Sequence, residues 1–171
     1  IQEAFEYSEK YGTPVFLRPT TRVCHGYASI MVKDETEYTH HQPEGFIKDS
    51  KRWVIFPRLS FMNHKKIEAR NQELSDIFSS YEKNTIHPSC DAFKDSKKGI
   101  ATGGISYTYT METLKKTGMV KTLKIATPHP FPEKLAVDFL SGLDEVLCLE
   151  ELDPVIEREL IYICGKYHLP T

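Results

Sequence analysis

The order of apolar and polar positions divides the chain into an irregular first half and a regularly patterned second half. From residue 84 onward, short apolar runs alternate with longer stretches that carry an apolar residue every three or four positions. The runs predict strands, and the stretches predict amphipathic helices. Strands that alternate with helices of this length are joined by right-handed crossovers in a mainly parallel sheet. Residues 84–171 are therefore predicted to form a three-layer α/β/α unit.

Turn and cap residues place the boundaries of these elements. The predicted strands are 98–102, 123–126 and 145–149. Gly103 and Gly104 mark a tight turn after the first strand, and Ser106 is the candidate N-cap of a helix that ends at Gly118. The helices are predicted to bury Tyr107, Met111 and Leu114; Leu135, Ala136, Phe139, Leu140 and Leu143; and Ile156, Leu160, Ile163, Cys164 and Tyr167. The second helix opens at Pro132-Glu133, and the third has Asp153 as its candidate cap before Pro154.

Fewer helices and strands are predicted in the first half of the chain. A helix over 1–11 carries Ile1, Ala4, Phe5 and Tyr11 on one stripe and stops at Gly12. An apolar run at 14–17 predicts a short buried strand. One helix and one strand cannot close a core, so residues 1–28 are interpreted as the end of a preceding α/β domain, cut from a larger protein.

Residues 29–83 are interpreted as a connecting region. Short strands are predicted at 30–32 and 52–57, and apolar spacing predicts a helix over 63–81. The intervening residues are polar and show no sustained period, which is typical of a loop.

Candidate chemistry lies where the predicted strands end, because ligands of open parallel sheets bind at that edge. The residues predicted there are Gly103, Gly104, Ser106, Thr127, Pro128, His129, Glu150, Glu151 and Asp153. A helix N-terminus, a histidine and adjacent carboxylates could serve acid–base catalysis. The structural alternative is that these residues cap helices, and the absence of a nucleophile–base pair favours it.

Two further patterns, a glycine pair and two pairs of possible metal ligands, are weak evidence for a binding site. Gly103-Gly104 lacks the spacing of a phosphate-binding loop, and backbone needs of a tight turn explain both glycines. Cys24-His25 and His40-His41 offer zinc-ligand types, but adjacent side chains on a strand point to opposite faces. We therefore expect no metal site.

Composition excludes some classes of function. The net charge is −2, with 40% hydrophobic and 27% charged residues, so neither nucleic acid nor a membrane is an expected partner. No apolar stretch is long enough to span a bilayer. The four cysteines form no C-x-x-C pair or disulfide framework. A reducing, cytoplasmic setting fits best.

A family resemblance rests on three segments. Residues 12–25, with the run Thr-Thr-Arg-Val-Cys-His, resemble the end of the pyrimidine-binding domain in the α subunit of indolepyruvate:ferredoxin oxidoreductases. Residues 99–107 and 146–154, the latter with the run Glu-Glu-Leu-Asp-Pro, resemble that family's next domain, which is similar to the carboxyl-terminal domain of transketolase. The resemblance covers essentially the whole chain and is weakest over 26–47.

The resemblance implies an anaerobic enzyme that oxidatively decarboxylates aryl 2-oxoacids. Its cofactors are thiamine diphosphate with Mg and [4Fe–4S] clusters, and its partners are a β subunit, coenzyme A and ferredoxin. The family's diphosphate motif and clustered cysteines are absent here. The chain is thus expected to be the non-catalytic middle of the subunit, inactive and without cofactor in isolation. Arg18, Arg22 and His25 are expected to lie near the active centre of the intact enzyme.

One alternative function and one expectation for the sheet remain. An autonomous flavodoxin-like module, which binds a small ligand or regulates another protein, is the alternative function. For the fold, the resemblance implies that residues 85–87 supply an antiparallel strand beside the three parallel ones. We expect at most these four strands, with an unpaired edge that can pair with another chain.

Overall fold

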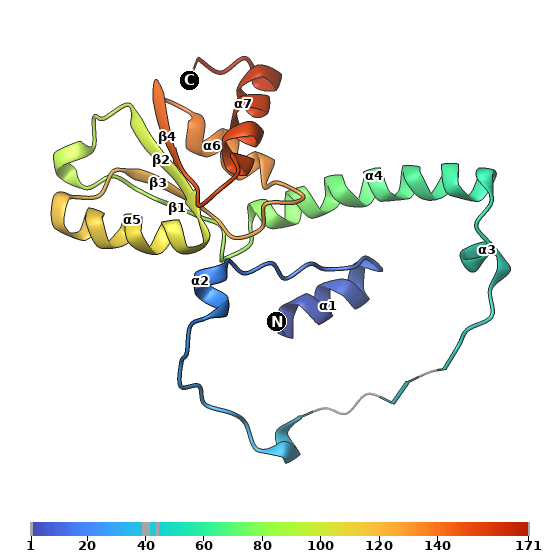
Figure 1. Ribbon diagram of the computed structural model, residues 1–171. Helices are drawn as coiled ribbons and strands as arrows, with labels where there is room; N and C mark the ends of the chain where they lie inside the picture. Colours follow the sequence, from blue (N-terminus) through green and yellow to red (C-terminus); the bar gives the residue numbers. More distant parts are fainter. Residues whose placement is uncertain (1, 39–41, 44, 171) are drawn as a thin grey trace.

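The computed structural model describes residues 2–38, 42–43 and 45–170, and Figure 1 shows their arrangement. The first half contains α1 (Gln2–Tyr11), α2 (Thr21–Cys24), α3 (Ser50–Trp53) and α4 (Pro57–Ser79). The second half contains β1 (Thr85–His87), β2 (Lys98–Gly103), α5 (Gly104–Thr117), β3 (Lys121–Ile125), α6 (Glu133–Leu140), β4 (Glu145–Leu149) and α7 (Val155–Tyr167). Two 3₁₀ turns lie at Glu35–Glu37 and Asp91–Phe93. The alternation predicted for the second half is confirmed, with β3 shifted slightly toward its N-terminus.

The four strands form one mixed sheet in the order β1-β3-β2-β4. Strand β2 is parallel to both of its neighbours, and β1 is antiparallel to β3. Helix α5 covers one face of the sheet, and α6 and α7 cover the other (Figure 1). The predicted three-layer α/β/α fold and its antiparallel strand are confirmed. Within the described residues β4 has no partner on its outer side, so the expected unpaired edge is present.

The hydrophobic core lies between the sheet and the helices α6 and α7. Its members are Ala101, Leu123, Ile125, Phe131, Ala136, Phe139, Leu140, Leu143, Ile156, Leu160 and Ile163. The helix faces predicted from spacing therefore supply most of this core. Leu135 and Cys164 are only half-buried, and Tyr167, at the end of α7, is exposed.

The start of α5 differs from the prediction. Gly103 is the N-cap, Gly104 is the first helical residue with φ of +54°, and Ser106 lies within the first turn. The Ser106 carbonyl accepts a hydrogen bond from Thr110 Oγ1 at 2.8 Å. The chain reaches the helix directly because a glycine tolerates a positive φ at the junction, which leaves no capping role for Ser106.

Helix α4 joins the connecting region to the α/β unit. It begins at Pro57, earlier than the predicted 63, because proline is well suited to a first helical turn. Its last turns pack on α6 (Figure 1), where Leu74 and Ser75 are buried and Ser75 Oγ donates to the Phe131 carbonyl at 2.5 Å. The amino-terminal half of α4 extends away from the sheet.

Helix α1 packs against the carboxyl end of α4 through aromatic side chains. Tyr7 lies 5.7 Å from Phe78 and 6.2 Å from Tyr81 between ring centroids. The Tyr81 hydroxyl also donates to Glu3. The predicted stripe is therefore partly wrong, because Phe5 is 71% exposed and Tyr7 makes the contact. Helix α1 ends before Gly12, as predicted, and Gly12 has a φ of +56°.

Three predicted strands of the first half are absent. Residues 14–17 and 30–32 are extended and exposed, with Phe16 at 89% and Met31 at 97%. Residues 50–53 form α3, in which Asp49 accepts from Lys51 N at 2.9 Å. The physical reason is shared: an apolar run becomes a strand only beside a partner strand, and these residues have none within the described chain.

Among the described residues, none of the helices combines the length and apolar character that a bilayer-spanning segment requires.

Candidate functional site

The carboxyl ends of β2, β3 and β4 form the edge at which the sequence placed candidate chemistry. In Figure 1 this edge faces α2, which lies just below the strand ends. The edge is built from the β2–α5 turn, the loop after β3 and the β4–α7 loop. We refer to these three segments as the carboxyl edge.

The two glycines of the β2–α5 turn serve packing. A Cβ atom on Gly103 would lie 2.6 Å from the Ile125 carbonyl oxygen and 3.3 Å from Ile156 Cδ1. Such a close approach to backbone cannot be relieved by a side-chain movement. Gly104 supplies the positive φ described above. The structural interpretation of this glycine pair is therefore supported.

Glu150 caps α7. Its Oε1 accepts hydrogen bonds from Val155 N at 3.0 Å and Ile156 N at 2.8 Å, and its Oε2 accepts from Glu157 N at 3.1 Å. The capping role predicted for Asp153 is wrong, because the carboxylate that reaches the free N–H groups comes from the end of β4. Both oxygens of Glu150 are occupied, which leaves this residue poorly suited to acid–base catalysis.

The remaining predicted residues of the edge do not converge. His129 and Glu151 are exposed, as is Asp153. Thr127 is instead held by Asn84, a buried residue that the sequence analysis missed. The Asn84 side chain donates to Thr127 Oγ1 at 2.6 Å and accepts from Ala126 N at 2.7 Å. A polar residue just before a predicted strand was the signal for this contact.

The loop of residues 18–25 meets the carboxyl edge. Arg22 Nη1 donates to the Tyr109 hydroxyl of α5 at 3.3 Å. Thr20 Cγ2 lies 3.9 Å from the position of a Cβ on Gly104, and Thr20 Oγ1 is buried without a hydrogen-bond partner among the described residues. The structure thus brings Arg22 to the edge. Arg18 and His25 are exposed.

A second polar contact that the sequence did not predict lies beneath α5. The Tyr107 hydroxyl and His87 Nε2 share a hydrogen bond of 3.0 Å, and their rings are stacked. Lys124 Nζ lies 4.8 Å from the centre of the Tyr107 ring. These groups satisfy one another between β1, β3 and α5, which favours a structural role.

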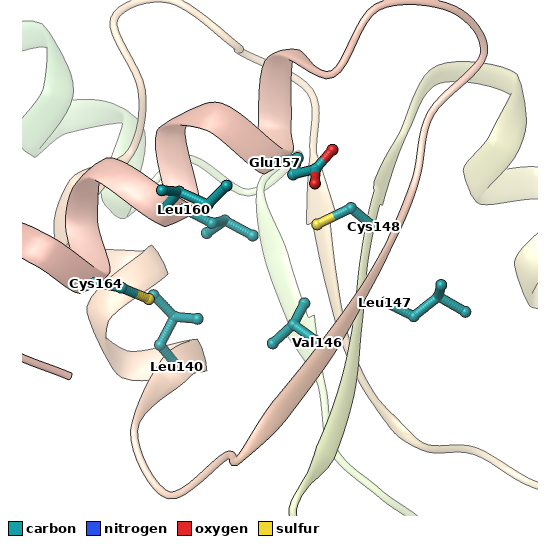
Figure 2. A pocket seen from close by; sticks show the side chains of 8 residues that line it. Leu140, Val146, Leu147, Cys148, Glu157, Leu160 and Cys164 are labelled. Atoms are coloured by element: carbon teal, nitrogen blue, oxygen red, sulfur yellow. The ribbon is translucent and has the colours of Figure 1, made fainter. Parts of the chain in front are cut away.

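A groove of about 410 Å³ lies on each side of β4. Figure 2 shows the groove on the α6–α7 side, where Leu140, Val146 and Leu160 form apolar walls and the Cys148 sulfur points into the groove below Glu157. Burial, with the charges of Glu157 and Glu150, raises the pKa of the Cys148 thiol to about 11. A thiol that stays protonated is a poor nucleophile near neutral pH.

The second groove runs between α5 and β4. Its apolar wall includes Ile100, Leu114 and Leu147, and its end at the carboxyl edge holds Ser106 and Tyr109. The Tyr109 side chain therefore belongs both to this groove and to the contact with Arg22.

The residues present do not fit the metal cofactors that the family resemblance implied. Within the described ranges no three His, Cys, Asp or Glu side chains gather where they could hold a metal ion. An iron–sulfur cluster requires several neighbouring thiolates, whereas the cysteines lie on α2, before a 3₁₀ turn, on β4 and on α7. His40 and His41, from the zinc hypothesis, lie outside the described residues.

Comparison with known proteins gives a consistent result. The chain is 35% identical over 171 residues to the indolepyruvate oxidoreductase subunit IorA of Methanothermobacter thermautotrophicus. This match covers 99% of this chain and 27% of that protein. The same subunit of Pyrococcus abyssi is 34% identical over 165 residues, with 94% and 25% covered. That of Thermococcus kodakarensis is 34% identical over 162 residues, with 92% and 24% covered.

The matched relatives are much longer than this chain. No protein-family model and no solved structure matches the chain. The chain spans about a quarter of the length of the curated relatives that it matches. The family suggested by the sequence motifs is thereby supported over nearly the whole chain. The chain is similar to one part of the IorA subunit of indolepyruvate oxidoreductases.

Proposed function

We propose that this chain is part of the α subunit of a cytoplasmic indolepyruvate:ferredoxin oxidoreductase. In the proposed reaction the bond between C1 and C2 of an aryl 2-oxoacid breaks and CO₂ leaves. The acyl carbon forms a thioester with coenzyme A, and the released electron pair passes to ferredoxin. The similarity to IorA subunits over nearly the whole chain carries this proposal.

Within that enzyme we assign the two halves of the chain different tasks. The α/β unit is a scaffold, because the glycine pair and Glu150 at its carboxyl edge serve packing and capping, and the remaining candidate groups do not converge. The loop 18–25 is the part proposed to face the substrate, since Arg22 is a charged residue held at the edge where ligands of parallel sheets bind. Thiamine diphosphate, Mg and the clusters are held by other parts of the intact enzyme and its β subunit.

The first test uses the isolated chain. Isothermal titration calorimetry with thiamine diphosphate and Mg²⁺ should show no binding at micromolar concentrations, because the described residues contain no cluster of metal-ligating side chains. The isolated chain should also fail to reduce ferredoxin with indolepyruvate and coenzyme A. Micromolar binding of the cofactor would contradict the assignment of a scaffold role.

The second test uses the intact complex. Arg22→Ala should lower kcat/KM for indolepyruvate by about 10- to 100-fold, the loss expected when a charge-assisted hydrogen bond to substrate is removed. Arg158→Ala, an equal change at an exposed position of α7, is the matched control. If the two variants have the same kinetic constants as the unmodified enzyme, Arg22 has no role near the substrate.

A further inference from the structure

The loop 18–25 is organised by its own hydrogen bonds before it contacts the α/β unit. Cys24 N donates to the Thr20 carbonyl at 3.0 Å, and His25 N donates to the Thr21 carbonyl at 3.1 Å. The Cys24 thiol lies 3.8 Å from the Pro19 carbonyl oxygen. These contacts form one short helical turn, so an anchor at a single point sets the position of the whole turn.

The anchor lies on α5. The hydrogen bond from Arg22 to Tyr109 joins residues 87 positions apart in the sequence, and Thr20 packs beside Gly104 at the start of the same helix. Both contacts involve the first two turns of α5. The turn of residues 20–25 is thereby held at the carboxyl edge.

The chemistry of the anchor leaves Arg22 available for another ligand. A phenol is a neutral acceptor, so it orients the guanidinium without neutralising its charge. Arg22 is exposed, and one hydrogen bond occupies only one of the five N–H groups of a guanidinium. The planar fork of the remaining N–H groups matches the two oxygens of a carboxylate.

We infer that Tyr109 is a positioning residue that orients the Arg22 guanidinium toward the carboxylate of the 2-oxoacid. The inference rests on the proposed function, since it assumes that the loop 18–25 faces the substrate. Tyr109 itself acts through Arg22. Its own ring stays half-exposed at the end of the groove between α5 and β4.

The test is Tyr109→Phe in the intact complex, which keeps the ring and removes the acceptor. The KM for indolepyruvate should rise about three- to tenfold with kcat changed less than twofold, the effect expected from one hydrogen bond. Inhibition by indoleacetate should weaken by the same factor, whereas inhibition by the neutral indoleacetamide should not change. Tyr162→Phe, the same change on the exposed side of α7, is the matched control.

A double-mutant experiment on Arg22 and Tyr109 distinguishes failure of this inference from failure of the proposed function. In an Arg22→Ala background, Tyr109→Phe should have no further effect on KM. If Arg22→Ala raises KM but Tyr109→Phe behaves like Tyr162→Phe, the positioning role is wrong and the proposed role of Arg22 stands. If Arg22→Ala has no effect, both fail. Equal weakening of indoleacetate and indoleacetamide would show a loss of packing and overturn the inference.

Discussion

The cap on α7 allows a quantitative test of how the β4–α7 loop stabilises the fold. Glu150→Ala removes acceptors for three backbone N–H groups, those of Val155, Ile156 and Glu157. Loss of a capping side chain costs about 1 kcal/mol, and loss of a negative charge at a helix N-terminus costs up to about 1 kcal/mol more. We therefore expect the free energy of unfolding to fall by about 2 kcal/mol.

Equilibrium unfolding in urea, followed by circular dichroism, measures this change. With a slope of about 2 kcal/mol/M, the midpoint should fall by about 1 M. Glu150→Gln keeps a side-chain acceptor and loses the charge, so it should cost about half as much. Glu151→Ala is the matched control, because Glu151 is exposed and contacts no helix end within the described residues. The reasoning fails if Glu150→Ala and Glu151→Ala unfold within about 0.5 kcal/mol of each other.

Three further predictions concern the sheet and the groove. Gly103→Ala should destabilise the fold by about 1–3 kcal/mol, because the new methyl group meets the Ile125 carbonyl; Gly165→Ala, which has open space around it, should not destabilise it in the same urea titration. At pH 8 only about one Cys148 thiol in a thousand is ionised. Iodoacetamide should therefore alkylate Cys148 more slowly than the exposed Cys24, with a rate that rises about tenfold per pH unit up to pH 11. Mass spectrometry showing equal rates at pH 8 would contradict this. The unpaired edge should cause concentration-dependent association in sedimentation experiments, and Leu147→Lys should suppress it; a wild-type chain that stays monomeric at high concentration would refute this prediction.

The second half of the fold could be predicted from sequence because its signals are local. Strand 145–149 and the buried faces of α6 and α7 follow from spacing alone, and Gly118 ends α5 as predicted. The errors have a different origin. Asp153-Pro154 has the local pattern of a helix start, but the carboxylate that reaches the helix belongs to Glu150, three residues earlier. Spacing does not report which of two nearby acidic side chains reaches the free N–H groups.

The first half shows the limit of apolar patterns more clearly. Residues 14–17 and 30–32 have the composition of strands, yet a strand also needs a neighbour, and no local pattern reports one. The contact between Arg22 and Tyr109 is harder still, because a polar pair 87 positions apart has no sequence period. The resemblance pointed to the loop, and only the fold showed which helix holds it.

The covalent link between α2 and α4 has a thermodynamic consequence. Because the chain joins the segment 2–25 to α4, it keeps that segment near α4 and α5 at an effective concentration of about 1 mM. At that concentration, contacts worth only about 4 kcal/mol suffice to keep half of the molecules docked. A single proteolytic cut after the exposed Lys33 would remove this link. The docked loop would then behave as a separate ligand, and dilution alone would release it.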